Sequence, residues 1–413
     1  MARTLDVYLH RQLCGTLRQT DSGRLSFAYS ADWLGHPDAA PLSQSLPLRA
    51  ASFAQGECQG YFGGILPEQT QRELIAKNLG ISSRNDFAML EGIGGECAGA
   101  VTLLKGGEPL LAESAEYRTL DAMELAESIR RLPLRPLLAG DEGIRLSLAG
   151  AQSKLAVRVA EGAISIPLDG APSTHILKPA AAHFKGIVSN EALCMKLASA
   201  IGLNTAEVAL GEVDGLEYLL VKRYDRAMEQ VADQPVIRRL HQEDFCQALG
   251  VVSELKYQSE GGPTLKQIFG LIRTASTTPV LDLQALLNAV IFNFLIGNCD
   301  AHGKNFSLLY GTETIGLTPL YDLVCTAAYP ELSPRMAMKI GSEYASDSVL
   351  PRHFEQLATD AGLSGRLAVS RVVELAAATL EHLPEVATGV KNATVEQEIR
   401  SRCERILHRF QSG

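Results

Sequence analysis

The sequence lacks the features that would place the chain in a membrane, in a secretory pathway or on nucleic acid. Its longest apolar stretch, Leu281 to Ile296, is interrupted by Asp282, Asn288 and Asn293, so it predicts a buried helix rather than a membrane span. The first residues alternate like a strand and carry neither the apolar core nor the cleavage site of a signal peptide. A formal net charge of −9 gives no general electrostatic attraction to DNA or RNA. We therefore expect a cytoplasmic protein with no membrane role, and contact with DNA only indirectly, through a partner.

Paired cysteines are missing as well. The eight cysteines are scattered along the chain without a C-x-x-C arrangement, which argues against a zinc ribbon and against a disulfide framework. We expect reduced thiols that are mostly buried. The composition, with 46% hydrophobic and 21% charged residues, does not indicate a repeat array or a long disordered tract. It favours a folded enzyme.

The length of 413 residues exceeds the size at which a single hydrophobic core usually keeps growing, so two lobes or domains are expected. Strand-like segments at Leu5–Leu9 and Arg24–Tyr29 are followed by helices predicted at Leu66–Gly80 and Asn85–Gly92. A boundary is placed between 105 and 140, where the two prolines of Leu132–Leu138 resist regular structure. The predicted parts are a β-rich N-terminal subdomain at 1–105, a small lobe at 140–238 and a mainly α-helical large lobe at 239–413.

The small lobe is predicted to be an antiparallel sheet with one helix. Ser189 is a good N-cap for that helix, which would run to Ala200. Strands are expected at Ile144–Leu148, Lys154–Ala160, Ala163–Pro167, Thr174–Lys178, Ala206–Leu210 and Glu217–Arg223. Helical periodicity then dominates at Gln242–Leu249, Leu265–Arg273, Leu283–Ile296, Pro351–Ala361, Leu367–His382 and Val395–Phe410. A mainly β lobe followed by a mainly α lobe predicts an α+β, protein-kinase-like bilobal fold.

The strongest chemical signal is the segment Asn298-Cys-Asp-Ala-His-Gly-Lys-Asn-Phe306, which follows the predicted buried helix. Asp300 and Asn305 stand five residues apart, which is the spacing of the base and the metal-binding Asn in a protein-kinase catalytic loop. Phosphoryl transfer uses such a pair because a carboxylate accepts the hydroxyl proton while the amide oxygen helps to hold Mg²⁺. The alternative is a polar turn that closes the helix, and the spacing alone leaves both open.

A second carboxylate follows at a suitable distance. Asp322 comes seventeen residues after Asn305, at the end of the apolar run Leu317-Thr-Pro-Leu-Tyr-Asp322. A protein kinase places its second Mg²⁺ ligand, the Asp of D-F-G, in such a position. Here the neighbours are Tyr321 and Leu323, so only the role of the carboxylate is carried over. A plain turn is the alternative.

Small residues and a lysine precede this segment. Ser147-Leu-Ala-Gly-Ala-Gln-Ser-Lys154 joins two predicted strands, and its small side chains would let backbone N–H groups approach phosphate oxygens. A plain hairpin turn has the same composition. Lys178 ends a predicted strand, as the phosphate-binding Lys of a kinase does. Glu191, early in the next helix, could hold that ammonium, or it could be a favourable charge near a helix N-terminus.

Together these segments resemble the HipA family of bacterial kinases. The matching segments recur in family order from about residue 5 to residue 355, and so many separate motifs are hard to obtain by chance. They are Pro41-Leu-Ser-Gln-Ser-Leu-Pro-Leu48, Gly64-Ile-Leu-Pro-Glu68, Gly99-Ala-Val-Thr102, Ser147-Leu-Ala-Gly-Ala-Gln152, Thr174-His-Ile-Leu-Lys178, Arg223-Tyr-Asp-Arg226, Gln242-Glu-Asp244, Asp300-Ala-His-Gly-Lys-Asn-Phe306 and Pro319-Leu-Tyr-Asp322.

The resemblance implies a kinase fold with a family-specific N-terminal subdomain, ATP and Mg²⁺ as cofactors, and Asp300 as the catalytic base. It makes Asn305 and Asp322 the Mg²⁺ ligands, Lys178 the phosphate clamp and Lys222–Tyr224 the hinge that contacts adenine. Ala149 to Lys154 would be the phosphate loop. The ATP-binding residues that it implies are Ala149, Gly150, Ala151, Gln152, Ser153, Lys154, Lys178, Lys222, Arg223, Tyr224, His302, Gly303, Lys304, Asn305, Tyr321 and Asp322.

The resemblance also implies regulation and partners. Ser147 matches the serine that the family autophosphorylates, and its modification displaces the phosphate loop and stops activity. An ordinary strand-end Ser is the alternative. The chain would be the toxin of a toxin–antitoxin pair with a HipB-like DNA-binding antitoxin. Its protein substrate would be an aminoacyl-tRNA synthetase or a translation factor, whose phosphorylation stalls growth and favours persistence.

Two departures from the family pattern stand out. The hinge begins with Lys222 where an acidic residue is familiar, which bears on ribose contacts more than on adenine contacts through the backbone. Gly341-Ser-Glu-Tyr-Ala-Ser-Asp-Ser348 is acidic, whereas the best-known relative has a lysine-rich loop that contacts DNA. This difference argues against direct DNA contact by the chain itself.

Three other functions stay open at this point. Asp300, His302 and Asp322 could form a metal-hydrolase cluster, although that hypothesis leaves Lys178 and the phosphate loop unexplained. A kinase of related fold could act on a small-molecule or lipid hydroxyl. A catalytically silent corepressor could bind an antitoxin on DNA, but such a protein has no need of Asp300, Asn305, Asp322 and Lys178 together.

Overall fold

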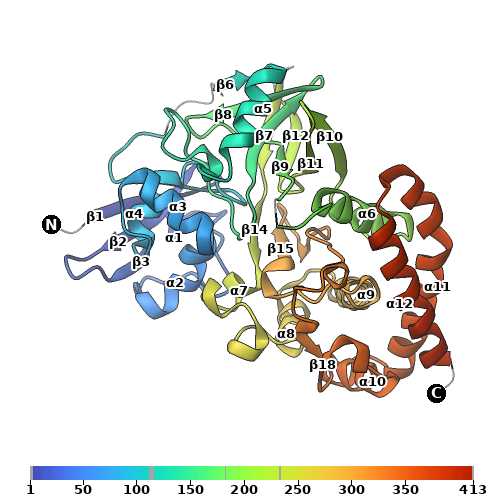
Figure 1. Ribbon diagram of the computed structural model, residues 1–413. Helices are drawn as coiled ribbons and strands as arrows, with labels where there is room; N and C mark the ends of the chain where they lie inside the picture. Colours follow the sequence, from blue (N-terminus) through green and yellow to red (C-terminus); the bar gives the residue numbers. More distant parts are fainter. Residues whose placement is uncertain (1–2, 111–115, 182, 232–233, 412–413) are drawn as a thin grey trace. The chain divides into compact units, whose positions relative to one another are not determined.

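The structure is a computed structural model that describes residues 3–110, 116–181, 183–231 and 234–411 (Figure 1). The chain folds into two compact units, and each is built from segments that are distant in the sequence. The first unit comprises Met1–Pro179, Gly211–Glu254 and Leu309–Gly311. The second unit comprises Ala180–Leu210, Leu255–Leu308 and Thr312–Gly413.

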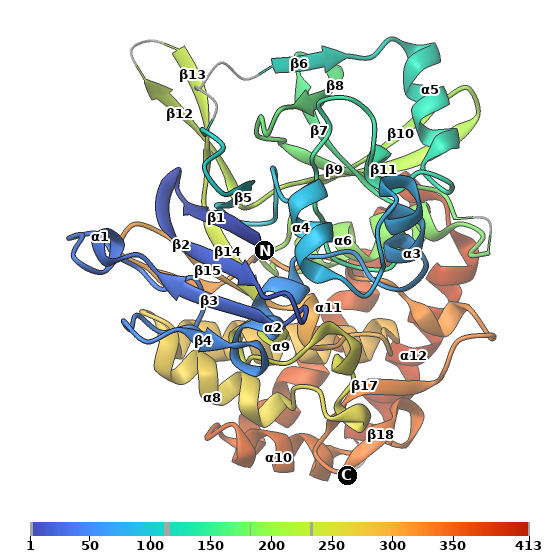
Figure 2. The ribbon, with the colours of Figure 1, turned by 90° about the vertical axis from the view of Figure 1, so that its left-hand side faces the viewer.

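The first unit begins with a five-stranded antiparallel sheet in the order β4-β3-β2-β1-β5 (Figure 2). Its strands are β1 (Arg3–Leu9), β2 (Gln12–Gln19), β3 (Leu25–Tyr29), β4 (Phe53–Ala54) and β5 (Val101–Lys105). Alternate side chains of a strand point to opposite faces, and in β1 the apolar residues Leu5, Val7 and Leu9 are the buried set. The two strands predicted in this region are therefore confirmed.

Five helices accompany this part of the first unit: α1 (Ala31–Leu34), α2 (Gln55–Gly64), α3 (Gln69–Leu79), α4 (Asp86–Ile93) and α5 (Ala122–Arg131). The predicted end of α3 at Gly80 is confirmed, since Gly80 closes the helix in the left-handed conformation, and Asn85 caps α4 through its side chain. The predicted start of α3 at Leu66 is wrong. Pro67 instead forms a parallel bridge with Gly150, which keeps the chain extended until Glu68.

A second sheet in the first unit has the order β10-β11-β9-β7-β8-β6. Its strands are β6 (Glu116–Thr119), β7 (Leu155–Ala160), β8 (Ala163–Leu168), β9 (His175–Pro179), β10 (Val208–Val213) and β11 (Leu216–Lys222). The strand predicted at Ile144–Leu148 is wrong, because that segment pairs with the chain only through an isolated bridge of Leu146 to Glu96. The hairpin of β12 (Arg226–Val231) and β13 (Gln234–Arg239) had not been predicted.

The helix predicted at Gln242–Leu249 is confirmed only for Phe245–Ala248, and its predicted first residues are wrong. The segment begins as strand β14 (His241–Asp244) and continues as the single-turn helix α7 (Phe245–Ala248). Asp244 starts the helix because its side chain accepts a hydrogen bond from the Gln247 N–H, while the Gln247 side chain accepts one from the Asp244 N–H.

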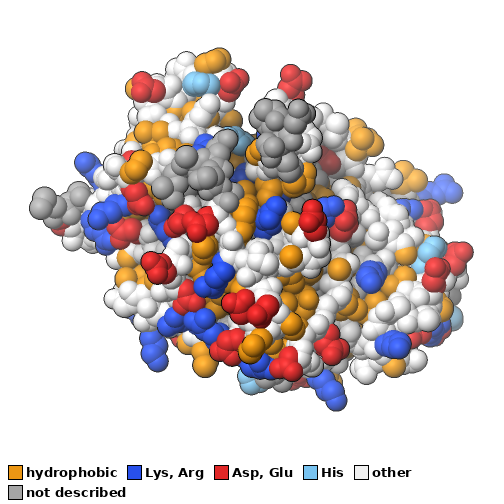
Figure 3. All heavy atoms as spheres, turned by 90° about the horizontal axis from the view of Figure 1, so that it is seen from above, with side chains coloured by type: hydrophobic (Ala, Val, Ile, Leu, Met, Phe, Trp, Pro, Cys, Tyr) orange, Lys and Arg blue, Asp and Glu red, His pale blue; other side chains and the backbone are white. Residues whose placement is uncertain are grey.

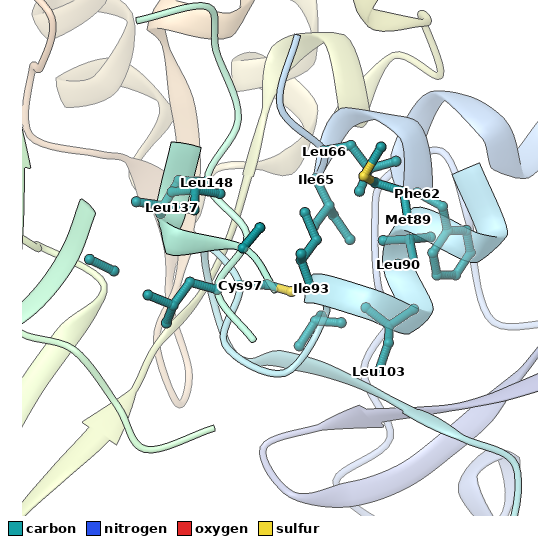
Figure 4. Packing of buried hydrophobic residues seen from close by; sticks show 14 of the residues in the cluster. Phe62, Ile65, Leu66, Met89, Leu90, Ile93, Cys97, Leu103, Leu137 and Leu148 are labelled. Carbon is teal, nitrogen blue, oxygen red and sulfur yellow. The ribbon is translucent and has the colours of Figure 1, made fainter. Parts of the chain in front are cut away.

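One hydrophobic core runs through the first unit, from β1 to Tyr218 in β11. Figure 4 shows a part of it in which residues of α2 and α4 lie beside Leu137 and Leu148, from the segment between α5 and β7. The labelled residues are Phe62, Ile65, Leu66, Met89, Leu90, Ile93, Cys97, Leu103, Leu137 and Leu148. Apolar packing thus joins the N-terminal five-stranded sheet and its helices to the six-stranded sheet. All eight cysteines of the chain are free and buried, as the sequence predicted.

The second unit is mainly helical. Its helices are α6 (Ile187–Ala200), α8 (Leu265–Ala275), α9 (Pro279–Ile296), α10 (Pro351–Asp360), α11 (Gly365–Val390) and α12 (Ala393–Gln411). Short strands connect them: β15 (Ser307–Tyr310), whose last two residues belong to the first unit, β16 (Ile315–Leu317), β17 (Arg335–Ile340) and β18 (Glu343–Ala345). Gly186 occupies the N-cap of α6, so the predicted start at Ser189 is wrong.

Helix α9 is the core of the second unit, and α8, α11 and α12 pack against it. Within the described residues it is the one helix long and apolar enough to cross a membrane, and 61% of it is buried inside the structure. This burial confirms the prediction of a buried helix. Its C-terminal end leads directly into the segment that carries the predicted catalytic residues.

Candidate active site

The segment with Asp300 is fixed to the end of α9 by a chain of hydrogen bonds. Gly297 ends the helix at φ 70°, a left-handed conformation that favours glycine. The Asn298 side chain then donates to Asn293 Oδ1 (2.7 Å) and accepts from the backbone N–H of Asp300 (3.2 Å). The backbone of Asp300 is therefore held, while the residue itself is exposed to solvent. An exposed carboxylate on a fixed backbone is accessible to a macromolecular substrate.

Asn305 and Asp322 are brought into direct contact. The 3₁₀ turn η4 (Gly303–Asn305) directs the Asn305 amide so that its oxygen accepts from the His302 N–H (3.0 Å) and its nitrogen donates to Asp322 Oδ2 (2.8 Å). Asp322 has φ 58°, a left-handed conformation that Asp tolerates better than most residues. The preceding Leu320 is held by a parallel bridge to Thr205 in the same unit. Two oxygen-bearing side chains thus meet beside the Asp300 segment.

Tyr321 connects the segment that carries Asp322 to the segment around η4. Its hydroxyl donates to the backbone carbonyl of Lys304 (2.7 Å) and lies 2.7 Å from Ser307 Oγ. Lys304 itself is buried, as are His302 and Gly303. The predicted residues of this segment therefore come together around η4, within a single unit.

One residue of this site was missed in the sequence. Tyr257 donates a hydrogen bond from its hydroxyl to Asp300 Oδ1 (2.8 Å), and its ring meets the His302 ring edge-on at 5.5 Å between centroids. The two partners are 43 residues apart, and no spacing rule or motif that we applied connects them. A tyrosine between turn residues gives no signal of this kind by itself.

The predicted phosphate loop, Ala149–Lys154, lies in the first unit. Gly150 has φ 106°, which a residue with a side chain rarely adopts, and its carbonyl accepts from the Glu68 N–H (3.2 Å). The Lys154 ammonium folds back onto the Ala149 carbonyl (2.7 Å). The segment around Pro67 therefore supports the loop from the N-terminal side, which gives a physical meaning to the motif Gly64-Ile-Leu-Pro-Glu68.

Ser147 is completely buried just before this loop. Its hydroxyl donates to the Ile65 carbonyl (2.9 Å), and its backbone N–H donates to the Glu96 carbonyl (2.9 Å). The next residue, Leu148, belongs to the core drawn in Figure 4. A kinase could reach this hydroxyl only after the segment had left its place in the core.

Lys178 lies in β9, where it is paired with Leu219 of β11 and has 7% of its surface exposed. A buried ammonium on a sheet is held in a narrow range of positions. Glu191 lies in the second unit, in the second turn of α6 and not in the first, so the alternative of a first-turn helix charge is wrong. It is almost completely buried.

The predicted hinge follows the end of β11. Lys222 is exposed, and the Tyr224 hydroxyl donates to Gln242 Oε1 (2.8 Å). The Arg223 backbone N–H donates to the Thr174 carbonyl (2.9 Å), and its guanidinium is buried within the protein. The Arg223 side chain is therefore engaged in the structure itself, which leaves its backbone carbonyl as the group that could contact a nucleotide.

The Arg223 guanidinium belongs to what we call the arginine network, formed by Glu96, Arg223, Asp225, Arg226 and Arg239. Arg223 contacts both oxygens of Glu96 (3.0 and 3.1 Å) and both of Asp225 (2.8 and 2.9 Å), and Arg226 donates to Glu96 (2.6 Å). Burial alone would raise the pKa of Glu96, but the three guanidinium groups outweigh it and lower the pKa to about 2. Glu96 is thus an ionised carboxylate at neutral pH.

The alternative of a metal hydrolase finds no support. Among the residues that the structure describes, no group of three or more His, Cys, Asp or Glu side chains is placed to hold a metal ion. Asp322 instead bonds the Asn305 amide, and Asp300 bonds Tyr257. A neutral amide beside a carboxylate offers hard oxygen ligands, which suit Mg²⁺ better than zinc.

Comparison with known proteins settles the family. The HipA N-terminal domain matches residues 5–104, and the HipA-like C-terminal domain matches residues 146–383. The chain belongs to the HipA family. It is 30% identical to the serine/threonine-protein kinase toxin HipA of Shewanella oneidensis, over 98% of this chain and 96% of that protein. It is 46% identical to a Sinorhizobium fredii protein whose name proposes a kinase, over 95% of this chain and 94% of that protein.

A solved structure of this family has the same fold. The toxin–antitoxin complex of HipA, HipB and operator DNA from Shewanella oneidensis matches with a TM-score of 0.85 at 27% identity, over 99% of both chains. This likeness confirms the predicted α+β fold class. The resemblance inferred from the sequence motifs is also confirmed, and this HipA-family chain is a kinase.

Proposed function

We propose that this HipA-family chain is a serine/threonine kinase toxin in which Asp300 is the general base. The observation that carries the proposal is that Asp300 and Asn305 lie on one short segment of the second unit, and that the Asn305 amide bonds Asp322 of the same unit. Asp300 is exposed and anchored, whereas the other two side chains meet each other. A general base must reach the hydroxyl proton, and it contributes about 10²- to 10⁴-fold to such reactions.

The reaction moves one proton and one phosphoryl group. The substrate hydroxyl oxygen bonds to the γ-phosphorus, the bond from that phosphorus to the β-phosphate oxygen breaks, and Asp300 takes the hydroxyl proton. ADP leaves, and the protein carries a phosphate ester. Because the transition state requires little covalent help, positioning of the base and neutralisation of charge are the contributions of the protein.

Asn305 and Asp322 fit the needs of Mg²⁺, because an amide oxygen and a carboxylate are the hard ligands that this ion prefers. Bound there, Mg²⁺ would neutralise phosphate charge. For ATP we assign Lys178 and the phosphate loop to the phosphates and the hinge Lys222–Tyr224 to adenine. His302, Gly303, Lys304 and Tyr321 complete the predicted nucleotide site around η4.

A HipB-like DNA-binding antitoxin is the partner that we propose, since the matching Shewanella structure is a complex of HipA with HipB and operator DNA. On the face shown in Figure 3, acidic and basic side chains are interspersed rather than gathered by sign. In the acidic segment Gly341–Ser348, Asp347 pairs with Arg402 of the same unit (3.2 Å). Both observations favour contact with DNA through the antitoxin rather than by this chain.

Ser147 is the site at which we propose autophosphorylation. Its buried hydroxyl, bonded to the Ile65 carbonyl, would have to be released, and a phosphate carrying up to two charges could not return to an apolar core. The phosphate loop begins two residues later, so it would be displaced with it. Modification would therefore end activity, and the toxin would limit itself.

Mass spectrometry tests the assignment. Wild type, Asp300→Asn and the control Asp360→Asn are first treated with a phosphatase and then incubated with Mg²⁺ and ATP. Asp360 is an exposed carboxylate of the same unit, paired with Lys266. We expect phosphate on Ser147 in wild type and in the control, and a loss of at least about 100-fold in the rate for Asp300→Asn.

The protein substrate is sought with the same variants. Each is added with ATP to a phosphatase-treated bacterial lysate, and new phosphoserine and phosphothreonine sites are compared. We expect sites that depend on Asp300 in an aminoacyl-tRNA synthetase or a translation factor. If wild type binds ATP yet phosphorylates neither itself nor any lysate protein, Asp300 is not the base of a protein kinase, and a small-molecule hydroxyl becomes the better hypothesis.

A further inference from the structure

None of the roles assigned so far accounts for the hydrogen bond from Tyr257 to Asp300. The Tyr257 hydroxyl lies 2.8 Å from Asp300 Oδ1, and both residues belong to the second unit. The ring is half-buried, whereas Asp300 is exposed. An exposed carboxylate turns readily about its side-chain bonds, so a partner at one oxygen determines where the other one lies.

The segment that carries Tyr257 is folded tightly. The Tyr257 carbonyl accepts hydrogen bonds from Glu260 N–H (3.0 Å) and Gly262 N–H (2.9 Å), which closes a turn around the 3₁₀ element η3 (Gln258–Glu260). A Cβ on Gly262 would lie 2.3 Å from the Leu255 carbonyl oxygen, so this turn requires glycine there. Gln258 adds an anchor, because its side chain accepts from the Lys339 N–H (3.1 Å).

The ring itself is held from the side. The His302 ring meets it edge-on, at 5.5 Å between centroids and 74° between planes, and His302 is buried. Lys256 places its ammonium 5.5 Å from the ring centroid. The phenol therefore has a defined position before any substrate binds. A side chain that orients a catalytic group needs such a fixed position.

We propose that Tyr257 is a positioning residue for phosphoryl transfer, whose hydroxyl fixes Asp300 Oδ1 and thereby assigns proton acceptance to Oδ2. The proposal rests on the proposed function, in which Asp300 is the base. Asn298 fixes the backbone of Asp300 and Tyr257 fixes its side chain, so the carboxylate is oriented from both ends. A misplacement of the reacting atoms by about 1 Å can cost about 10²-fold in rate, which sets the scale of the effect.

The test is Tyr257→Phe in the full-length chain, which removes the hydroxyl and keeps the ring against His302. The initial rate of phosphate transfer from labelled ATP to protein is measured over a range of ATP concentrations. We expect kcat to fall about 10- to 100-fold while the KM for ATP stays within about twofold of wild type. The matched control is Tyr344→Phe in β18, whose ring contacts Arg335 and which should behave as wild type.

A double-mutant cycle separates positioning from a general loss of structure. In the Asp300→Asn background, Tyr257→Phe should change the residual rate by less than about twofold, because the group that it orients is no longer a base. A variant that merely weakens the fold would lower the rate in both backgrounds.

The possible outcomes distinguish this inference from the proposed function. If wild type transfers phosphate and Tyr257→Phe does so at the same kcat, the positioning role is refuted and Asp300 stays the base. A higher kcat for Tyr257→Phe also refutes it, because the phenol would then block the place of the substrate hydroxyl. If wild type transfers no phosphate to protein, the proposed function fails, and the inference fails with it.

Discussion

Two fully buried glutamates in the first unit have opposite electrostatic surroundings. Both oxygens of Glu96 accept hydrogen bonds from guanidinium groups, and its pKa is lowered to about 2 although burial acts in the other direction. Burial raises the pKa of Glu243 to about 7, although hydrogen bonds from Tyr310 and the backbone of Gln44 counteract it. Burial alone therefore does not decide whether a carboxylate is charged; the charge of its neighbours does.

The two glutamates also differ in the hydrogen bonds that their carboxylate oxygens accept. Glu243 Oε1 accepts from the Gln44 N–H (2.9 Å) and from the Tyr310 hydroxyl, while Oε2 has no hydrogen-bond partner among the described residues. A buried anion with one unsatisfied oxygen is costly, so the neutral acid is favoured. Glu96 joins the N-terminal segment to the predicted hinge through Arg223, and as a permanent anion it suits a structural role.

Breaking the arginine network should have the largest effect. Glu96→Gln keeps the shape of the side chain but leaves two buried guanidinium groups, those of Arg223 and Arg226, with one carboxylate, Asp225. Removing one partner of a buried ion pair costs about 3–5 kcal/mol, and we expect a loss of that size in the free energy of unfolding. Urea denaturation at pH 7 measures it. Because Arg223 belongs to the segment that we propose as the adenine hinge, the KM for ATP should also rise.

The control is the same substitution in an exposed pair. Glu229 and Arg238 face each other across the β12–β13 hairpin at 2.9 Å, each with 42% of its side chain exposed. Glu229→Gln should cost less than about 1 kcal/mol. If Glu96→Gln costs no more than this control, the network contributes little to stability. The charged neighbours of Glu96 would then not set it apart from Glu243 energetically.

The pH dependence of stability should have opposite signs for the two carboxylates. The folded-state pKa of Glu96 is depressed, so its contribution is present above pH 4.5 and is lost as the pH falls towards 2. The folded-state pKa of Glu243 is raised, so the contribution of Glu243 to stability is present below pH 4.5 and is lost as the pH rises through about 7. Over that second interval the loss should reach about 3 kcal/mol.

Glu243→Gln isolates the second effect, because the variant cannot release a proton there. Its free energy of unfolding relative to wild type, measured in urea at pH 5 and at pH 8, should rise by about 2.5 kcal/mol between the two. An equal difference at both pH values would mean that Glu243 is already ionised in the folded protein at pH 5.

Local patterns predicted much of the fold and the central residues of the candidate site. The alternation in β1, the cap at Asn85 and the stop at Gly80 act within a few residues, and the sequence shows them directly. Asp300 and Asn305 were found for the same reason, since their spacing is set by one short segment. The start of the helix predicted at Gln242–Leu249 was wrong although the sequence carried a signal for it, because Asp244 and Gln247 have the spacing of a capping box.

Long-range partners could not be predicted. Glu96 and Arg223 are 127 residues apart, and a glutamate in a glycine-rich stretch looks like a solvated turn residue until the fold buries it. Ile144–Leu148 has the apolar pattern of a strand, but its bonding partner is the backbone of Glu96 at a single bridge. Tyr257 belongs to the same class, since the role that we propose for it depends on a contact with Asp300 that no local pattern encodes.

The smallest expected effect concerns a single hydroxyl. Tyr310→Phe removes a donor to Glu243 Oε1 and an acceptor for the Gln44 side chain (3.1 Å), and it should cost about 1 kcal/mol at pH 5. With one donor fewer to stabilise the anion, the pKa of Glu243 should rise, so the pH at which stability is lost should move upward in the urea series. The control Tyr29→Phe removes a buried hydroxyl that bonds Leu42 N–H and the Leu46 carbonyl instead. It should cost a similar amount without moving that pH. A downward shift in Tyr310→Phe would show that the hydroxyl stabilises the neutral acid, and the low donor count at Glu243 would no longer explain its difference from Glu96.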